Sequence, residues 1–425
     1  MLKKSKIIFA FMLALLICLT SVSTALASNL VDGGALIGDE ENPVQAAITK
    51  NFRLPEMTTI PNVNFNFLVT PKTVDGVDFN PDSPNMPRIG AETDTLGTGK
   101  FTLSFSSDDE DLKEPAEGLV NAFSIQKETP NIFAGIKFPH AGIFEYTVTE
   151  EPNTNERIDN PENVNEWLSY SPAVYTLTVY VANSEDGEST YVHSLGTLVT
   201  TTNPGQPGGD KVDPTPGGYE EEYRFSQIMF INDYVRNQGP VNPINASTLS
   251  ISKTVTGDFG SHDLDFSFSI SLEIPSIVPD IPEYYRAYIR YADGTVSDDY
   301  IEVSTSEATT FTLKHGQKLV FIDTPVGTSY RVTETGTQHY FPSLSVITNG
   351  VKVDYEELKI GEAFISEQQF VGELANSADF TNRRDTVTPT GLNLSTLPFI
   401  ILIALGLCAL IAFIGIKMRK RARYY

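Results

Sequence analysis

Cysteine is nearly absent from this sequence, and basic residues are scarce. The 425 residues include two cysteines, Cys18 and Cys408, and both lie in apolar runs near the ends of the chain. The stretch between these runs therefore has no thiol for a disulfide or a cysteine-based metal site. Acidic residues number 54 against 30 lysines and arginines. Eight of the 30 lie in the two ends, which leaves 22 and a net charge of −32 for the stretch between, so no nucleic acid is expected as a partner.

The chain also lacks the residue patterns of common enzyme and metal sites. Its five histidines are scattered, with no zinc-helix spacing, phosphate loop or nucleophile elbow. The acidic run Asp108–Asp111 lacks the surrounding pattern of a calcium loop and indicates a charged turn. We therefore expect no metal, no cofactor and no turnover enzyme.

Both ends of the chain carry membrane-directed segments. Lysines in the first six residues precede the apolar run Ile7–Leu19, and Ala25–Ala27 offers small residues for signal peptidase, so residues 1–27 are predicted to be a signal peptide. The apolar run 397–416 is long enough to cross a bilayer as a helix, and the basic tail 417–425 resists translocation. The chain is thus expected to be exported and held transiently in the membrane by its C-terminal helix.

A short motif, Val387-Thr388-Pro389-Thr390-Gly391, lies in the tether 385–396 before this helix. Motif, helix and basic tail in this order resemble the sorting signal of Gram-positive sortase substrates. The resemblance implies that a sortase cuts between Thr390 and Gly391 and anchors the protein covalently at the cell surface, on peptidoglycan or on another subunit. The motif is closer to pilin variants than to the common L-P-x-T-G, which leaves the class of sortase open. The alternative is an ordinary single-pass anchor with Pro389 and Gly391 as linker residues.

The exterior between the two ends is predicted to be all-β. Apolar and polar residues alternate in short runs separated by turn residues, and there is no convincing amphipathic helix. A polar stretch with two prolines predicts a short, stiff linker between two domains. The predicted organisation is a flexible acidic arm at 28–44, a first domain at 45–236, the linker at 237–247 and a second domain at 248–384.

The two predicted domains repeat three short patterns in the same order. Each begins with a strand that contains a lysine, continues with a strand of the form Tyr-x-Val-Thr-Glu, and closes with a strand that contains an asparagine. The lysines are Lys50 and Lys253, the glutamates are Glu150 and Glu334, and the asparagines are Asn232 and Asn382.

Strand periodicity directs all six of these side chains into the interior. Residues two apart share a face, and an apolar residue stands two positions before each of the six, as Ile48 does before Lys50. Burial lowers the pKa of a lysine and raises that of a glutamic acid. The neutral amine can then attack the asparagine carbonyl, while the protonated carboxyl polarises that carbonyl and transfers a proton as ammonia leaves. The product is an intramolecular Lys–Asn isopeptide bond, formed once per molecule.

Each residue taken singly also has an ordinary explanation. A strand lysine is usually a surface group, a glutamate after a strand usually caps a turn, and an asparagine usually ends a strand. The ordered recurrence with matching inward direction favours the reaction over these alternatives.

With these residues in place, the chain resembles the streptococcal-type major pilins with two intramolecular isopeptide domains. The resemblance rests on the patterns around the six residues and on the sorting motif, and it covers nearly all of the mature chain. It implies two tandem immunoglobulin-like β-sandwich domains of the CnaB kind, and covalent joining to identical or other pilin subunits by a sortase. It also implies the site residues: a bond from Lys50 to Asn232, a bond from Lys253 to Asn382, and Glu150 and Glu334 as the catalytic acids.

The acceptor lysine for that joining is less clear. The family places it close to the last strand of the first domain, but residues 212–233 contain no lysine. Lys211 is the nearest candidate, in a loop rich in proline and glycine that should leave its amine accessible. A solvated loop lysine without function is the alternative, and Lys72, Lys100 and Lys137 remain competitors.

A competing interpretation is a monomeric wall-anchored adhesin, or a minor or basal pilin, whose β domains display a surface for host ligands. Such proteins often carry an additional N-terminal binding domain. Only the arm at 28–44 is left unassigned here, which disfavours this interpretation without removing binding by loops.

Overall fold

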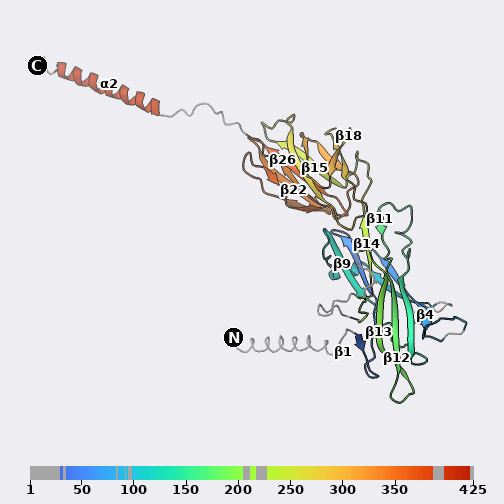
Figure 1. Cartoon of the computed structure of the whole chain (residues 1–425). Coiled ribbons are helices and arrows are strands. Elements are labelled where there is room, and N and C mark those ends of the chain that lie inside the picture. The colour runs from blue at the N-terminus through green and yellow to red at the C-terminus, as the bar shows by residue number, and fades with distance from the viewer. Residues whose placement is uncertain are drawn as a thin grey trace, which may run out of the picture.

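Two β-rich bodies in tandem are followed by one C-terminal helix, α2, in the computed structural model of the chain (Figure 1). The structure describes residues 29–31, 35–82, 85–90, 92–93, 98–203, 211–216, 227–385 and 397–421. The all-β fold class predicted from the sequence is confirmed.

The first body is a sandwich of two sheets. A nine-stranded sheet has the order β1-β2-β13-β12-β10-β4-β7-β6, with β5 paired to β4, and a five-stranded sheet has the order β11-β14-β3-β9-β8. A short 3-10 helix, η1 (Ser107–Leu112), follows β7. The strands are β1 (Asn29–Val31), β2 (Ala35–Ile37), β3 (Thr49–Pro55), β4 (Val63–Val74), β5 (Val77–Asp78), β6 (Glu92–Thr93), β7 (Gly99–Phe105), β8 (Glu114–Pro115), β9 (Ala122–Glu128), β10 (Gly142–Glu150), β11 (Glu166–Leu168), β12 (Val174–Asn183), β13 (Thr190–Thr201) and β14 (Met229–Arg236).

The second body is also a sandwich. A seven-stranded sheet has the order β18-β17-β20-β15-β26-β22-β23, and a five-stranded sheet has the order β19-β16-β21-β24, with β25 paired to β21. The strands are β15 (Leu249–Thr256), β16 (Phe266–Glu273), β17 (Tyr284–Arg290), β18 (Val296–Ser304), β19 (Thr309–Leu313), β20 (Lys318–Phe321), β21 (Ser329–Glu334), β22 (Phe341–Thr348), β23 (Val351–Asp354), β24 (Phe364–Ile365), β25 (Gln369–Phe370) and β26 (Ser377–Arg383).

Aromatic side chains fill both cores, because alternate residues of facing strands point into the space between the sheets. In the first core the ring of Phe65 lies 5.2 Å from Phe52 and 5.7 Å from Phe105, measured between centroids. In the second core Phe268 lies 5.3 Å from Phe311. The buried apolar clusters of the described residues run from Val44 to Phe380, so the segment 28–385 contains all of the packing described.

The two sandwiches are in direct contact. The carboxylate of Glu373 in the second body accepts hydrogen bonds from the Thr59 backbone N–H at 2.9 Å and from Arg236 at 3.0 Å. The Asn121 amide of the first body donates to the Glu273 carbonyl at 2.9 Å. A small apolar cluster includes Val235 of the first body and Ile277 of the second. The junction therefore combines buried apolar surface with charged hydrogen bonds.

The chain between β14 and β15 is fastened to the second sandwich. Gln238 donates to the carbonyls of Gly372 and Leu374. The Arg290 guanidinium donates to the carbonyls of Pro243 and Ala246, the latter at 2.7 Å. These contacts hold the predicted linker at both of its ends.

The predicted flexible arm at 28–44 contains strands in the structure. β1 and β2 pair with each other, and β2 joins the nine-stranded sheet through Ile37 opposite Ser194 on β13. At the other end, α2 (Leu397–Arg421) contains the predicted membrane segment 397–416, and its stretch Ile401–Met418 is long and apolar enough to cross a bilayer. The predicted signal peptide at 1–27 lies outside the described residues.

Candidate functional site

The first and last long strands of the first sandwich lie side by side and parallel. β3 pairs with β14 so that Lys50 is opposite Phe230 and Phe52 is opposite Asn232. Lys50 and Asn232 are therefore diagonal neighbours two residues apart, with both side chains on the core side of the five-stranded sheet. Both residues are fully buried, with an exposed fraction of 0%.

Glu150 reaches these two residues from the facing sheet. It is the last residue of β10 in the nine-stranded sheet, where the buried residues Tyr146 and Val148 set its inward direction. Its Oε1 accepts a hydrogen bond from Lys50 Nζ at 3.0 Å and another from Asn232 Nδ2 at 2.7 Å. One carboxylate oxygen thus contacts both the amine and the carboxamide.

The second sandwich repeats this arrangement. β15 pairs in parallel with β26, and Lys253 lies opposite Phe380 while Val255 lies opposite Asn382, which is the same two-residue offset. Glu334, the last residue of β21 in the facing sheet, accepts from Lys253 Nζ at 2.5 Å and from Asn382 Nδ2 at 2.7 Å, again through Oε1. The structure therefore brings together each predicted set of lysine, glutamate and asparagine.

Aromatic rings enclose both lysine amines. Lys50 Nζ lies 4.2 Å from the ring centroid of Phe65, and Lys253 Nζ lies 4.2 Å from that of Phe266. These phenylalanines open the pairs Phe65-Asn-Phe67 and Phe266-Ser-Phe268, which lie on the next strand after each lysine strand, β4 and β16. The second of the pair packs against the strand of the asparagine, as Phe67 does on Phe230 at 5.1 Å. Each cluster thus lies in a dry aromatic surrounding.

This surrounding shifts the pKa values of both partners toward their neutral forms. Burial lowers the pKa of Lys50 to about 8, although the Glu150 carboxylate opposes the shift. Burial likewise lowers the pKa of Lys253 to about 8 against the opposing effect of Glu334. Burial raises the pKa of Glu150 and of Glu334, and the neighbouring lysine opposes the rise. A neutral amine beside a protonated carboxyl is therefore favoured more than it would be in water.

The two clusters differ at the second carboxylate oxygen. Glu150 Oε2 accepts a hydrogen bond from the Ser171 backbone N–H at 2.8 Å. Glu334 Oε2 is buried and has no hydrogen-bond partner among the described residues. A donor to the carboxylate stabilises its charged form, so Glu150 is held more firmly as an anion than Glu334 is. Ser171 lies in the loop before β12, and the repeat in the sequence does not point to it.

The side-chain oxygens of both asparagines lack partners as well. Asn232 Oδ1 and Asn382 Oδ1 are buried, and neither has a hydrogen bond within the described part of the chain. A buried carbonyl without a donor is costly, so a hydrogen bond donated by a protonated glutamic acid would be strongly favoured there.

Comparison with known proteins identifies related domains and a related whole chain. Residues 49–234 match the family of the Spy0128-like isopeptide containing domain, and residues 247–384 match a domain family of unknown function, DUF7601. A protein named "Pilin" from Streptococcus pyogenes serotype M1 is 25% identical over 407 residues, which cover 94% of this chain and 96% of that protein. The chain belongs to the streptococcal-type major pilins.

Two further proteins are similar to this pilin. The "Pilus tip adhesin Cpa" of Streptococcus pyogenes is 29% identical over 177 residues, which cover 40% of this chain and 22% of the adhesin. A crystal structure of the major pilin from Streptococcus pyogenes covers 81% of this chain and 100% of that chain, at 21% identity and a TM-score of 0.32. The match to the protein named "Pilin" extends over nearly the whole chain, and the match to the adhesin does not. The protein is accordingly a pilus backbone subunit, which is a structural protein and not a turnover enzyme.

The structure places some of the remaining predicted residues of this pilin. Lys211 forms an isolated β-bridge with Leu198, and its side chain is exposed. The next residue, Val212, is buried and donates its N–H to the Thr197 carbonyl at 3.1 Å. A solvent-facing amine thus stands on a segment fastened to β13. The sorting motif 387–391 lies outside the described residues.

The competing lysines are placed differently. Lys72 lies on β4 with its amine 3.9 Å from Glu145, Lys100 lies on β7, and Lys137 is exposed before β10. Exposure therefore does not separate Lys211 from Lys137, and position near the last strand of the first sandwich is the feature that favours Lys211.

Proposed function

We propose that both domains of this pilin close an internal Lys–Asn isopeptide bond, from Lys50 to Asn232 and from Lys253 to Asn382. The observation that carries the proposal is the shared oxygen: Glu150 Oε1 lies within hydrogen-bond distance of both reacting groups, and Glu334 Oε1 does the same in the second domain. A single carboxyl can then collect a proton from the amine and deliver it to the leaving group.

The reaction balances without any co-reactant. The neutral Nζ of Lys50 attacks Cγ of Asn232, while protonated Glu150 donates its proton to the amide oxygen and stabilises the developing charge. Nζ then loses a proton to the carboxylate, and the same carboxyl protonates Nδ2. The Cγ–Nδ2 bond breaks as the hydroxyl oxygen returns its proton to the carboxylate and the carbonyl re-forms. One amide bond forms, one breaks, and one molecule of ammonia leaves. Glu150 ends in its starting protonation state, so it acts as a catalyst of a single event.

The fold supplies the proximity that this reaction requires. An amide is a poor electrophile in water, and the barrier falls when two groups are held in near-attack geometry. Here parallel pairing of the first and last strands fixes the diagonal offset, and the facing sheet brings in the glutamate. The reaction can therefore proceed only after both sheets have packed.

The positions of the two bonds determine how the pilin carries tension. A force that enters at Thr390 would pass along β26 to Asn382, cross to Lys253, and leave along β15. Residues 254–381 would then carry no load, and the second domain could not be pulled open. If Lys211 is the lysine to which the neighbouring subunit is joined, the bond in the first domain would lie off the direct path of the force. It would then chiefly protect that domain against heat and proteases.

We also propose that a sortase cleaves between Thr390 and Gly391 of the motif 387–391 and joins Thr390 to Lys211 of the next subunit. Terminal subunits would be joined to peptidoglycan instead, from a precursor held in the membrane by α2. The exposed amine of Lys211 and the apolar length of α2 support this order of events.

The assignment of Lys211 as the acceptor lysine is tested with cell-wall extracts from cells that express Lys211→Ala. A ladder of covalent multimers in the wild type that is lost in this variant supports the assignment. Lys137→Ala is the matched control, since it removes another exposed lysine and should leave the ladder unchanged. Loss of the ladder in Lys137→Ala with retention in Lys211→Ala would reassign the joint.

A further inference from the structure

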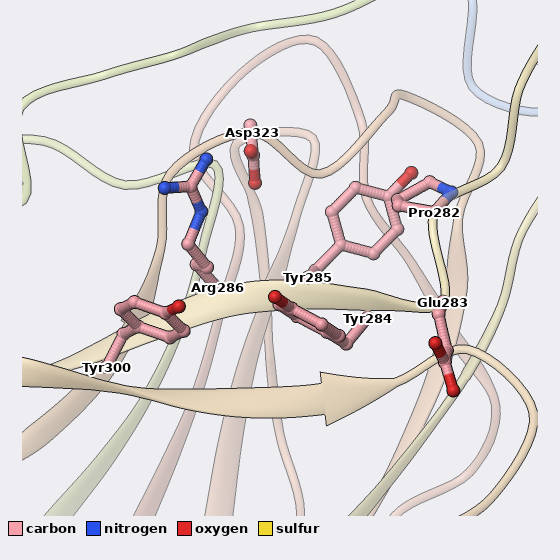
Figure 2. Close-up of a pocket in the computed structure, with 7 residues that line it drawn as sticks. All are labelled: Pro282, Glu283, Tyr284, Tyr285, Arg286, Tyr300 and Asp323. Carbon is pink, nitrogen blue, oxygen red and sulfur yellow. The ribbon is translucent and has the colours of Figure 1, made fainter.

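A hollow of about 490 Å³ opens at one margin of the seven-stranded sheet, and no residue of either lysine cluster lines it. It is lined by the start of β17, by Tyr300 on the edge strand β18, and by Asp323 in the turn after β20. Figure 2 shows the Asp323 carboxylate directed toward β17, with Arg286 on one side of it and Tyr285 on the other.

Three polar groups in this hollow have no partner in the described part of the chain. Asp323 Oδ1 is buried and accepts no hydrogen bond. The side chain of Tyr285 is 6% exposed, and its hydroxyl reaches the hollow without a hydrogen bond. The Arg286 guanidinium forms no ion pair and lies 5.8 Å from the ring centroid of Tyr300. Arg286 is exposed, and Asp323 Oδ1 is the atom of the three that is buried without a partner. Such an atom is costly, so it indicates a group that a ligand in the hollow would satisfy, with the guanidinium and the hydroxyl beside it.

The three groups differ in hydrogen-bonding character, and this difference restricts the ligand. The carboxylate only accepts, the guanidinium only donates, and the tyrosine hydroxyl does both. A molecule that presents several hydroxyl groups can satisfy all three at once. The exposed face of Tyr300, together with Tyr284, offers aromatic surface against which the C–H face of a sugar ring can pack.

Charge argues for a neutral ligand. Asp323 and Glu283 both line the hollow, and the exterior of the protein is strongly acidic, so an anionic group would be repelled. A cationic group would in turn be repelled by the Arg286 guanidinium. Burial raises the pKa of Asp323, while Arg286 opposes the rise, so the two charges already interact across the hollow.

We propose that this hollow is a binding site for a neutral sugar unit, of the size of a mono- or disaccharide. In this site the Asp323 carboxylate accepts a hydrogen bond from a hydroxyl of the sugar, and the Tyr285 hydroxyl donates to or accepts from another. Arg286 donates to a sugar oxygen. Tyr284 and Tyr300 contact the ring. The proposal does not depend on the isopeptide bonds, since none of its residues belongs to either cluster.

The test is a saturation-transfer NMR titration of the segment 28–385 with the methyl glycosides of glucose, galactose and N-acetylglucosamine. Binding of at least one glycoside is expected. Tyr285→Phe removes one hydroxyl and keeps the buried ring, and it should weaken binding about fivefold or more, as should Arg286→Ala. The controls are Tyr291→Phe, at an exposed tyrosine outside the hollow, and Arg331→Ala, at an exposed arginine on β21. Both should bind as the wild type does.

Glucuronate and diglycine are included to separate the ligand classes. Absence of binding by every neutral glycoside overturns the proposal, and so does equal binding by the wild type, Tyr285→Phe and Arg286→Ala. Binding of glucuronate or diglycine alone overturns the assignment to a neutral sugar.

Discussion

Replacing Lys253 by methionine would remove the second bond while keeping an unbranched side chain of similar length in the core. The variant leaves no buried amine behind, so the loss of stability reports chiefly the loss of the crosslink. The bond closes a loop from Lys253 to Asn382, about 130 residues, for which the chain-entropy treatment of a crosslink gives about 5 kcal/mol. For a domain of this size that free energy corresponds to a fall in melting temperature of about 15 °C.

Differential scanning calorimetry of the segment 28–385 measures this change. The second domain is expected to melt about 15 °C lower in Lys253→Met than in the wild type. Lys318→Met is the matched control, because Lys318 is an exposed residue on β20 of the same sheet and its removal should not change the melting temperature. Equal melting temperatures for Lys253→Met and the wild type would refute the crosslink and the reasoning from loop length.

Three further predictions concern the same bonds. In single-molecule pulling from both ends, the wild-type second domain should not extend. The variant Glu334→Gln should release about 130 residues, or about 40 nm of chain. Extension of both proteins alike would contradict the proposed force path. Mixing the segment 28–375 with a peptide of residues 376–385, which contains β26, should give a covalent product whose rate of formation depends on pH. Neutralisation of Lys253, whose pKa is lowered to about 8, should speed the reaction, and loss of the proton from Glu334, whose pKa burial raises, should slow it. A rate that does not depend on pH between 5 and 10 would exclude this acid–base pair. During refolding followed by mass spectrometry, the second domain should lose ammonia before the first. The Ser171 N–H stabilises the charged form of Glu150, whereas Glu334 has no such donor among the described residues. The reverse order would show that this hydrogen bond does not limit the reaction.

The six cluster residues could be found from the sequence because each lies on a strand. A period of two, set by apolar neighbours such as Val148 and Val332, directs Glu150 and Glu334 inward, and the structure buries both. The recurrence in two halves distinguished these residues from ordinary polar strand residues. Their chemical roles remain predictions.

Features made by loops could not be found in this way. Ser171 acts through its backbone N–H, which any residue other than proline supplies, so its identity carries no signal. The hollow near Asp323 joins a strand start to a turn that follows another strand, and no periodic pattern relates them. The acidic, glycine-rich composition of residues 28–44 predicts a flexible arm, whereas in the structure β2 adds to the edge of the sheet beside β13.

The contact between the two sandwiches could not be predicted from the sequence either. The segment around Glu373 has the polar composition of an exposed turn. In the structure, however, the Glu373 carboxylate accepts hydrogen bonds from Thr59 and Arg236 of the other domain. Such pairings depend on the relative placement of the domains, which strand patterns do not determine.

The central claim is that each domain loses one molecule of ammonia as its bond forms. The intact mass of the segment 28–390 tests it most directly, in comparison with Glu150→Ala and Glu334→Ala. The wild type is expected to be lighter than its sequence mass by two losses of about 17 Da, and each variant by a single loss. Tandem mass spectrometry should then find the remaining bond in the domain that was not altered. A wild-type mass equal to the sequence mass would contradict the account, because the two clusters would then be buried strand residues that do not react.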